Sequence, residues 1–533
     1  MGNVIAMYDV TGIQDYIFRT SKMRDAIGAS AIVENIIGEA LQDAAAKEIK
    51  KLEYKWDTEA GPLEYKEDDN SDIKVLYIGG GNAYVEFADM DTARLISKRM
   101  AKYTMDKTYS LQLAVALSNK TGNYKEDYKK LNDIMTDTKA KMIVSRPVGA
   151  LPVMQVEVKT GYPITNPPEG INPAMSTESK LKLESVNKVR SSLKKDADKK
   201  KLESYIEDKG TDSMLAVVHI DGNNMGQRIK ALIEDITDYT VAVNKMRNIS
   251  HNINYSFKKV FEDMQDTFNN FSFAKTRFEN KTHKDSFVMK VITAGDDITY
   301  VCTASIALAT VEYFCKRISQ LCMYQVETSD IDLNFSACAG ISYFNSHFPF
   351  NIAYDVAEEC CDSAKKRAKK NKVGDRIGNW VDFQFCRNIQ ARNLDRIRNE
   401  EYITSGNLKL LRRPYYISVD NDEIFDNIKT GKFSYDEFCK DMVKYVLDTE
   451  NNIPHAYVKE LRNTYPLGEK QVSELCSFLK SRNRDLPDEM FFEDTCNIDS
   501  DDNDGKTQKI ALLYDALEVS DYFLSVEDMK KED

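Results

Sequence analysis

The sequence predicts an α+β protein with two ferredoxin-like βαββαβ units in tandem, followed by an α-helical domain. The same order of apolar strands, hairpin and charged helix occurs twice along the chain. Asp9 of the first copy corresponds to Asp221 of the second, and Lys139 corresponds to Lys365. The number of residues between corresponding positions increases slowly along the chain, as small loop insertions would cause. The chain has 533 residues, of which 42% are hydrophobic and 30% charged, and this composition is typical of a globular protein with several structural units.

The first unit covers residues 1–159. Its apolar runs alternate with polar turns that contain glycine, a pattern typical of strands and hairpins. The N-terminal strand reaches Asp9 and continues into a turn and a helix. The predicted elements are a strand and helix in 4–18, a hairpin with a glycine-rich tip in 75–87, a strand in 111–119 and a charged helix in 124–142.

Residues 160–212 have a different character from the units on either side. They begin with the Pro- and Gly-rich stretch GYPITNPPEGINPAMS, which is typical of an ordered linker. Residues 177–210 are highly charged and are a candidate helix. We therefore expect a linker and a charged helical segment between the two units.

The second unit covers residues 213–386. It opens with a buried strand that ends at Asp221, and a polar turn and the start of a helix follow. The interpretation gives the order strand, helix, strand, hairpin strand, helix, strand. Its later elements are a hairpin in 291–302, a strand in 333–344, a helix in 353–370 and a short strand in 381–385. Cys360 and Cys361, on the helix, are expected in the core.

Residues 387–533 are predicted to form a C-terminal helical domain. Segments such as SYDEFCKDMVKYVLDTE and GEKQVSELCSFLKSRN have the periodic apolar positions of packed helices. Such helices are candidates for binding a protein partner or a second copy of the chain.

Charge and cysteine content limit the function classes. The formal net charge of −12 argues against broad, non-specific nucleic-acid binding, although a local basic pocket is compatible with it. The ten cysteines form no CxxC pair, and the N-terminus lacks the pattern of a signal peptide. No apolar run is long enough to span a membrane. We therefore expect reduced thiols and a cytoplasmic location.

The stretch VITAGDDITYVC places two adjacent carboxylates, Asp296 and Asp297, at the tip of an apolar hairpin. Asp221 ends the strand that runs beside this hairpin in a βαββαβ unit, so we expect all three carboxylates to lie close together. They would repel one another without a cation, and oxygen ligands select Mg²⁺ or Mn²⁺. The sequence therefore predicts a site for two such ions at Asp221, Gly222, Asp296 and Asp297, the three aspartates being catalytic. The alternative is an ordinary polar turn.

Further residues are candidates for binding nucleotide. The turn after Asp221 opens a helix whose N–H groups suit a triphosphate, and Lys365 adds a cation. His219, within the strand, is interpreted as a core histidine, and Lys369 is either a phosphate contact or part of a solvated face. The candidates around the carboxylates are Asn223, Asn224, Met225, Gly226, Ala294, Gly295, Lys365 and Lys369.

The hairpin tip of the first unit contains no carboxylate. It consists of Gly79, Gly80, Gly81 and Asn82. We therefore expect no catalytic metal pair there. Glycines allow a close approach to the backbone, so the tip is expected to hold a second nucleotide, and the alternative is a structural relic.

These motifs together resemble a known family over roughly residues 1–385. AGDDITYV resembles the GGDD hairpin of the large polymerase-cyclase subunit of type III CRISPR effector complexes, and HIDGNNMG resembles that family's Asp-Gly-Asp/Asn-x-Met-Gly turn. AEECCDSAK is similar to the helix of GGDEF diguanylate cyclases that ends in a phosphate-binding lysine, here Lys365. GIQDYIF and IGGGNAYVEF look like the family's degenerate first palm. The resemblance implies two palm domains that hold nucleotides between them and convert ATP into cyclic oligoadenylate-type messengers.

The sequence also departs from the family pattern. Ala294 replaces the first Gly of GGDD, which could change the product, and Asn223 stands where Asp is frequent. There is no His-Asp dipeptide and no Cys-rich segment between the units. We therefore expect a reduced, stand-alone-like member without the family's nuclease domain or zinc knuckle.

The resulting hypothesis is a metal-dependent nucleotidyltransferase. It would convert ATP or other nucleoside triphosphates into a cyclic oligonucleotide or dinucleotide, with release of pyrophosphate, in antiviral defence signalling. A polymerase with short linear products would use the same chemistry, and a non-catalytic scaffold of a CRISPR-like complex is a third alternative. The sequence leaves specific RNA binding open.

Overall fold

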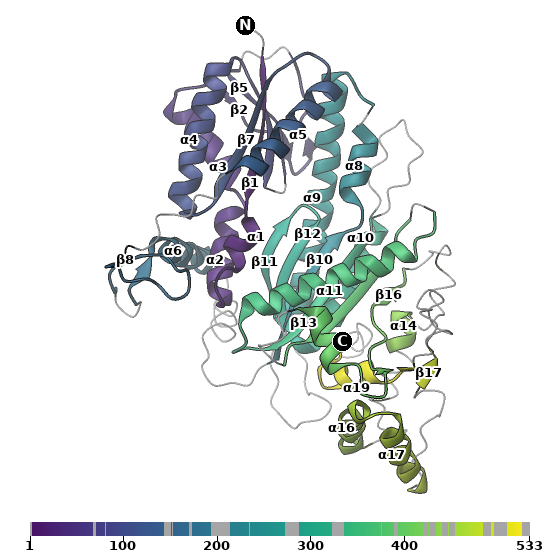
Figure 1. Cartoon of the computed structure of the whole chain (residues 1–533). Coiled ribbons are helices and arrows are strands. Elements are labelled where there is room, and N and C mark those ends of the chain that lie inside the picture. The colour runs from purple at the N-terminus through teal and green to yellow at the C-terminus, as the bar shows by residue number, and fades with distance from the viewer. Residues whose placement is uncertain are drawn as a thin grey trace.

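The computed structural model describes residues 3–67, 71–79, 81–142, 151, 153–169, 173–192, 214–233, 235–271, 287–321, 335–374, 376–387, 393–419, 425, 433–439, 446, 454–482, 492–494 and 509–524. Two sheets with their helices lie one above the other, and the C-terminal elements lie beyond the second sheet (Figure 1). No helix of these described segments is long and apolar enough to cross a membrane.

The first sheet has the strand order β2-β5-β6-β1-β7. Its four long strands pair in antiparallel fashion, and the short β2 is parallel to β5. The strands are β1 (Val4–Thr11), β2 (Leu52–Glu53), β5 (Ile73–Gly79), β6 (Asn82–Phe87) and β7 (Gln112–Asn119). The helices are α1 (Ile13–Phe18), α2 (Met23–Val33), α3 (Ile36–Lys47), α4 (Met90–Thr108) and α5 (Tyr124–Lys141). The sheet thus contains every strand that the sequence predicted for the first unit.

The second sheet has the strand order β11-β12-β10-β13-β14-β16. Its strands are β10 (Met214–Gly222), β11 (Val288–Ala294), β12 (Asp297–Thr303), β13 (Ala337–Asn345), β14 (Asn379–Phe385) and β16 (Tyr415–Ile417). Its helices are α8 (Met225–Ile233), α9 (Tyr239–Asn269), α10 (Ala307–Gln320) and α11 (Phe350–Lys370). The order of the first four strands, β11-β12-β10-β13, repeats the order β5-β6-β1-β7 of the first sheet.

The predicted order of strand, helix, strand, hairpin strand, helix and strand is observed from β10 to β13, but the second of these helices, α10, was not located from the sequence. This helix connects β12 to β13 and buries residues on nearly every turn, including Val311, Phe314 and Ile318. No Gly, Pro, Asn or Asp separates β12 from α10 in the sequence, so no turn signal marked the start of a new element. α11 follows β13, as predicted for the helix in 353–370, and it leads into β14, which is parallel to β13. In the first unit α5 follows β7 in the same way.

The segment between the units packs on the first unit. It contains β8 (Ile164–Asn166), β9 (Met175–Ser176) and α6 (Thr177–Ser192), and residues 193–212 of the predicted charged segment lie outside the described residues. α6 lies against α2, and the buried Lys182 donates hydrogen bonds to the Tyr16 carbonyl and to Glu178 Oε1. This part of the charged segment is therefore a packed helix.

The C-terminal region is not purely helical, in contrast to the prediction. Its described helices are α12 (Leu394–Glu401), α14 (Tyr435–Glu437), α16 (His455–Thr464), α17 (Glu469–Ser481) and α19 (Tyr514–Val519). It also contains a small sheet of β15 (Leu408–Lys409), β18 (Lys509–Ala511) and β17 (Phe492–Asp494), while β16 extends the second sheet. These strands are two or three residues long, too short to produce a periodic pattern.

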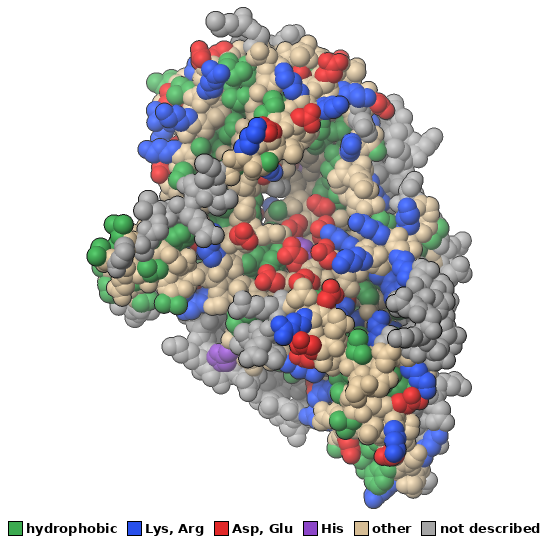
Figure 2. All heavy atoms as spheres, in the orientation of Figure 1, with side chains coloured by type: hydrophobic (Ala, Val, Ile, Leu, Met, Phe, Trp, Pro, Cys, Tyr) green, Lys and Arg blue, Asp and Glu red, His purple; other side chains and the backbone are tan. Residues whose placement is uncertain are grey.

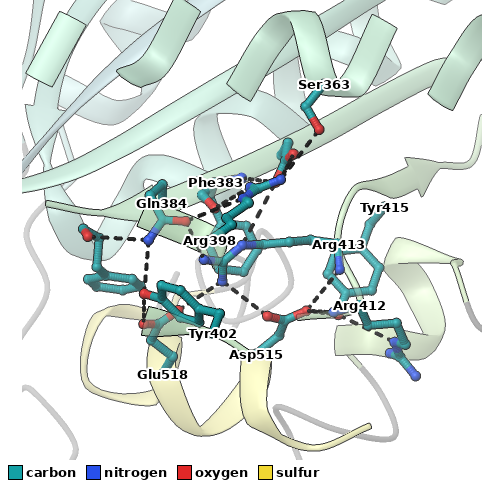
Figure 3. A network of polar contacts seen from close by, with 12 residues as sticks. Ser363, Phe383, Gln384, Arg398, Tyr402, Arg412, Arg413, Tyr415, Asp515 and Glu518 are labelled. Carbon is teal, nitrogen blue, oxygen red and sulfur yellow. Dashed lines mark hydrogen bonds and ion pairs between the residues drawn. The ribbon is translucent and has the colours of Figure 1, made fainter. Parts of the chain in front are cut away.

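Buried charges attach the C-terminal region to the second sheet. Arg413 is fully buried, and its Nη1 donates to Asp515 Oδ1 at 3.0 Å and to Glu518 Oε2 at 2.8 Å, both on α19. Figure 3 shows Arg413, which precedes β16, beside Gln384 of β14, Arg398 of α12, and Asp515 and Glu518 of α19. Arg398 of α12 pairs with Asp382 of β14 at 2.7 Å in the same network. The C-terminal helix is therefore held to the sheet by paired, hydrogen-bonded charges.

Candidate nucleotide and metal site

The pairing of β10 with β12 brings two of the three predicted carboxylates face to face. Asp221 lies opposite Asp297 in the antiparallel register. Ala294 pairs with Asp297 across the hairpin, so Gly295 and Asp296 form its two-residue turn, and Gly295 has the positive φ of +67° that glycine favours. The Gly222 N–H donates to the Asp296 carbonyl at 3.3 Å. The structure therefore brings together the three predicted aspartates and Gly222.

Lys365 of α11 contacts Asp221 through its ammonium group. α11 reaches this position because it lies unusually close to β13 at Gly340, where an added Cβ would be 2.0 Å from the Ala357 carbonyl oxygen. A side chain at position 340 would push the helix away from the sheet. Gly340 therefore positions the lysine that balances Asp221.

The carboxylates of the hairpin are electrostatically strained. Burial, and then the neighbouring Asp221, raises the pKa of Asp296 to about 6 and that of Asp297 to about 7. Asp297 Oδ1 is buried and has no hydrogen-bond partner in the structure. Like charges directly opposite each other in a sheet are unfavourable. The site thus favours an added positive charge.

This donor set fits a hard divalent cation. Carboxylate oxygens are the ligands that Mg²⁺ and Mn²⁺ prefer, and the unpartnered Asp297 Oδ1 is available to one. As the side chains are placed, no three His, Cys, Asp or Glu residues of the described segments form a group that could hold a metal ion. The Lys365 ammonium lies beside Asp221 instead. Binding of a cation would therefore require Lys365 to move away from Asp221.

His219 is a core residue, as the sequence indicated. Its side chain is buried, with Nδ1 3.0 Å from Thr299 Oγ1 and the ring edge-on to Tyr354. Burial lowers the pKa of His219 to about 4, so the ring is neutral at pH 7.

The turn after Asp221 has a different role from the predicted one at Asn223. The Asn223 side chain donates to Ser336 Oγ and the Gly378 carbonyl, both at 3.1 Å, and accepts from Cys338 Sγ. Its N–H donates to the Ser336 carbonyl. Asn223 is therefore engaged inside the protein, where it fixes the turn. Asn224 has a positive φ of 56°, and Met225 is buried.

The first unit repeats the geometry of the site without its hairpin carboxylates. Asp9 lies opposite Asn82 in the first sheet, and Asp221 lies opposite Asp297 in the second. Across the hairpins, Gly79 pairs with Asn82 in the first unit and Ala294 pairs with Asp297 in the second. Lys139 Nζ contacts Asp9 Oδ2 at 2.7 Å, which repeats the Lys365–Asp221 pair. Both hairpins have a register shift at the corresponding position. The two pairs are thus structurally equivalent.

The tip of the first hairpin is close-packed on one side. Gly81 has φ +84°, and an added Cβ would meet Ile13 at 2.8 Å. Gly80 lies outside the described residues. The described tip therefore offers backbone groups and the Asn82 amide, and no carboxylate.

A cavity of about 870 Å³ lies between the two units and is lined by both hairpin tips. Gly79 and Asn82 line it from the first unit, and Ala294, Gly295 and Asp296 line it from the second. Gly226 of α8 also contributes, whereas Lys365 and Lys369 are not among the lining residues, and Lys369 is exposed. A volume of this size is near the top of the range of roughly 300–1,000 Å³ for small-molecule sites.

Sequence reasoning missed the other walls of this cavity. α5 supplies Tyr124, Lys125, Tyr128, Lys129, Asn132 and Asp133, and α8 and α9 supply Ile229, Lys230, Ile233, Met246, Ser250, Ile253 and Asn254. The repeated Tyr and Lys of YKEDYKK were the available signal, but only the packing of the two units shows that this helix face borders a cavity.

An acidic surface borders the carboxylates. Asp355, Glu358, Glu359 and Asp362 follow one another along α11, and Gln14 of α1 donates to Glu358 Oε1 at 3.1 Å. Burial raises the pKa of Glu358, the hydrogen bond from Gln14 lowers it by less, and repulsion from neighbouring carboxylates raises it further. Figure 2 shows a hollow between the upper and central parts of the molecule, with acidic side chains gathered on its lower rim.

Comparisons with known proteins identify the second unit. Residues 214–374 match the family model of the Cas10/Cmr2 second palm domain. No match is found among curated proteins.

Several solved Csm1–Csm4 complexes are similar to the chain. The apo Csm1–Csm4 cassette is 16% identical over 97% of this chain and 69% of that chain, with a TM-score of 0.49. The cassettes in complex with cA4 and with AMPPNP are 16% and 14% identical, each over 69% of this chain and 53% of that chain, with TM-scores of 0.39. This chain thus spans about half the length of the latter two chains. Residues 214–374 of this chain are thus similar to the second palm domain of the Cas10/Cmr2 family.

Proposed function

We propose that this protein is a metal-dependent nucleotidyltransferase that joins nucleoside triphosphates, ATP among them, into a cyclic oligonucleotide or dinucleotide messenger. The observation that carries the proposal is the cavity shared by the two hairpin tips, with Asp296 in its wall and next to Asp297, which lies opposite Asp221. The proposal includes two ferredoxin-like palms, and the repeated strand order supports it. It also includes the division into residues 1–159, 160–212, 213–386 and 387–533.

Each residue of the site has a role in this reaction. Asp221, Asp296 and Asp297 would hold one or two Mg²⁺ or Mn²⁺ ions, which activate the acceptor hydroxyl and neutralise charge on the phosphates. The hydroxyl oxygen of the acceptor bonds to the α-phosphorus of the donor triphosphate, and the bond from that phosphorus to pyrophosphate breaks. The hydroxyl proton is released to solvent. Lys365, once separated from Asp221, is available to a phosphate group.

The first palm holds the second nucleotide in this proposal. Its tip lines the same cavity, and it has Asn82 where the second palm has Asp297. A ring closes when the product's own hydroxyl oxygen, in place of a new acceptor's, bonds to the α-phosphorus of its 5′-triphosphate; the bond from that phosphorus to pyrophosphate breaks and the hydroxyl proton goes to solvent. Csm1 is found in complexes with Csm4, and we propose a protein partner for this chain as well, acting in cytoplasmic antiviral signalling.

The test is incubation of the purified protein with each nucleoside triphosphate and Mg²⁺ or Mn²⁺, followed by mass spectrometry of the products. We expect pyrophosphate and a cyclic product from the wild type and none from Asp296→Asn or Asp297→Asn. Asp137→Asn on the exposed face of α5 is the matched control and should retain activity. Linear products would establish the polymerase alternative. Undiminished turnover in Asp297→Asn would refute the metal assignment.

A further inference from the structure

One long helix, α9, contacts both units. It has 31 residues and is therefore about 45 Å long at a rise of 1.5 Å per residue. Figure 1 shows it running from the level of the first sheet to that of the second. Its N-terminal half contacts the first unit, where Tyr239 donates to Asp127 Oδ2 at 2.6 Å and Asn244 Oδ1 accepts from the Tyr65 N–H at 2.7 Å. α9 is therefore a connection between the units as well as an element of the second one.

Arg247 of α9 binds the strand that leads into the first hairpin tip. Its side chain is buried and donates three hydrogen bonds of 2.7 Å, from Nε to the Leu76 carbonyl, from Nη1 to the Leu63 carbonyl and from Nη2 to the Val75 carbonyl. A register shift between Val75 and Tyr77 leaves Leu76 of β5 without a partner residue in β6. A guanidinium donates its hydrogen bonds in one rigid plane, so these three bonds define the position of β5 relative to α9.

The C-terminal half of α9 binds the corresponding strand of the second unit. Gln265 Nε2 and Asn269 Nδ2 donate to the Val288 carbonyl at 2.9 and 3.2 Å, and Asn269 Oδ1 accepts from the Val288 N–H at 2.7 Å. Phe261 packs on Tyr300 of β12, with ring centroids 5.6 Å apart. β11, which begins at Val288, has the place in the second sheet that β5 has in the first. One helix therefore holds both equivalent strands.

The middle of α9 lies beside the hairpin of the second unit. Ser250, Ile253 and Asn254 line the cavity between the units. A Cβ added to Gly295 would lie 3.8 Å from Asn254 Oδ1. β5 and β11 lead directly into the two hairpin tips that line the same cavity. A change in the distance between these two strands would therefore change the distance between the tips.

We propose that Arg247 is a positioning residue for nucleotidyl transfer: it holds β5 to α9, whose other half holds β11, and so fixes the separation of the two hairpin tips. Arg247 does not line the cavity, so it acts through β5 and does not touch a nucleotide. This inference rests on the proposed function and deepens it, because it names the connection that keeps two bound nucleotides at reacting distance. Reacting atoms must approach to about 3–3.5 Å, and a misplacement of about 1 Å can reduce the rate about a hundredfold.

The first experiment measures the separation of the units in EDTA, and therefore does not depend on catalysis. Nitroxide labels are attached through unnatural amino acids at two exposed positions, Lys98 of α4 and Arg317 of α10, and pulsed electron paramagnetic resonance measures the distance between them. We expect one narrow distance distribution in the wild type and a broader or displaced one in Arg247→Met. Lys258→Met, which removes an exposed cation from α9, is the matched control and should match the wild type. The same distribution in Arg247→Met and the wild type would overturn the proposal.

A variant at the other end of α9 tests the same connection if Arg247→Met does not fold. The double variant Gln265→Met/Asn269→Leu removes the hydrogen bonds to Val288 at two partly exposed positions. We expect it to broaden or displace the distance distribution in the same way. A wild-type distribution in this variant would also overturn the proposal.

The second experiment measures turnover of ATP with Mn²⁺. We expect Arg247→Met to lower kcat about tenfold or more and to change KM by less than about twofold, because the contacts to each nucleotide remain while their separation is no longer fixed. Arg247→Lys keeps the charge and one donor group, and should recover part of kcat.

The kinetic outcomes separate this inference from the proposed function. An unchanged kcat in Arg247→Met, or a loss through KM alone, would overturn the inference and leave the proposed function intact. No product from the wild type would count against the proposed function, while the distance measurement would still decide whether Arg247 fixes the separation of the units.

Discussion

Asp297 combines three properties that a purely structural aspartate would avoid. It lies opposite Asp221, its buried Oδ1 accepts no hydrogen bond and lies 3.4 Å from His219 Nδ1, and its pKa is raised to about 7 by burial and then by neighbouring carboxylates. In an unfolded chain an aspartate has a pKa of about 3.9. Between pH 4 and 7, the folded protein without metal therefore keeps a proton on Asp297, whereas the unfolded chain has already lost it.

This difference gives a prediction for stability. The contribution of Asp297 to the free energy of unfolding is fully present below about pH 4 and is lost as pH rises through about 7. The metal-free wild type should therefore become less stable over that range. The Asp297→Asn variant lacks this titrating group. Between pH 4 and 8 we expect the free energy of unfolding of the wild type to fall by about 2 kcal/mol relative to that of the variant, a value that allows for the partial exposure of the side chain.

Urea denaturation in EDTA at several pH values measures this difference. Asp137→Asn is the control for loss of a surface carboxylate. Mn²⁺ at pH 8 should restore stability to the wild type and leave Asp297→Asn unchanged. Parallel pH profiles for the wild type and Asp297→Asn would contradict the prediction.

Ala294 allows a second prediction at this scale. It lines the cavity immediately before Gly295, where the related hairpin motif has glycine. One methyl group changes contact energy by about 1 kcal/mol, which is less than tenfold in rate. We expect Ala294→Gly to remain active and to shift the nucleotide preference or the product distribution in mixtures of nucleoside triphosphates. Identical profiles would show that the methyl group does not contact the nucleotide.

At the scale of elements, the packing of α11 on β13 sets the position of Lys365. Gly340 permits this packing, since an added Cβ would lie 2.0 Å from the Ala357 carbonyl oxygen and 2.3 Å from the Cys361 nitrogen. Both are backbone atoms, which cannot move without moving the helix. The close approach therefore couples the fold of the second sheet directly to the charge balance at Asp221.

Gly340→Ala should reveal that coupling. We expect it to lower the free energy of unfolding by about 3 kcal/mol or more and, in whatever fraction folds, to reduce activity by displacing Lys365. Thermal or urea denaturation measures the first effect. Gly406→Ala is the control, because its nearest neighbour would be an ordinary 3.8 Å away. A Gly340→Ala protein as stable as this control would mean that α11 and β13 are less closely packed.

At the scale of the whole molecule, the C-terminal region and the second sheet are joined by the buried network around Arg413. This guanidinium contacts Asp515 and Glu518 and lies over the Phe383 ring with 4.2 Å to its centroid. Removing one partner of a buried charge cluster leaves the others unpaired, which is strongly destabilising. None of the charged residues of this network lines the cavity between the two units.

Arg413→Met should therefore separate docking from catalysis. We expect a loss of about 3–5 kcal/mol in the stability of this junction. Hydrogen exchange should show faster exchange in α19 and β16, with little change in α5 and α8 around the cavity. Arg396→Met is the control, since Arg396 makes an exposed pair within α12. If hydrogen exchange in α19 and β16 of Arg413→Met were as slow as in the rest of the protein, this result would contradict the importance of the network.

The sequence by itself determined the features that depend on local pattern. The strands of both units, the two hairpin tips and the alignment of Asp9 with Asp221 follow from apolar runs, turn residues and an internal repeat, all of which are readable within short windows. The proximity of Asp221 to Asp297 followed because a βαββαβ order leaves few ways to pair its strands. Register then brings specific side chains opposite one another.

Tertiary structure alone decided the features that depend on contacts between distant segments. Asn223 is engaged with Ser336 and Gly378, and the tyrosines and lysines of α5 line the same cavity as Asp296 only because the two units pack together. The short strands of the C-terminal region exist only by pairing with other strands. Burial, pairing and cavity shape arise from residues far apart in the chain, so no local window of the sequence contains them.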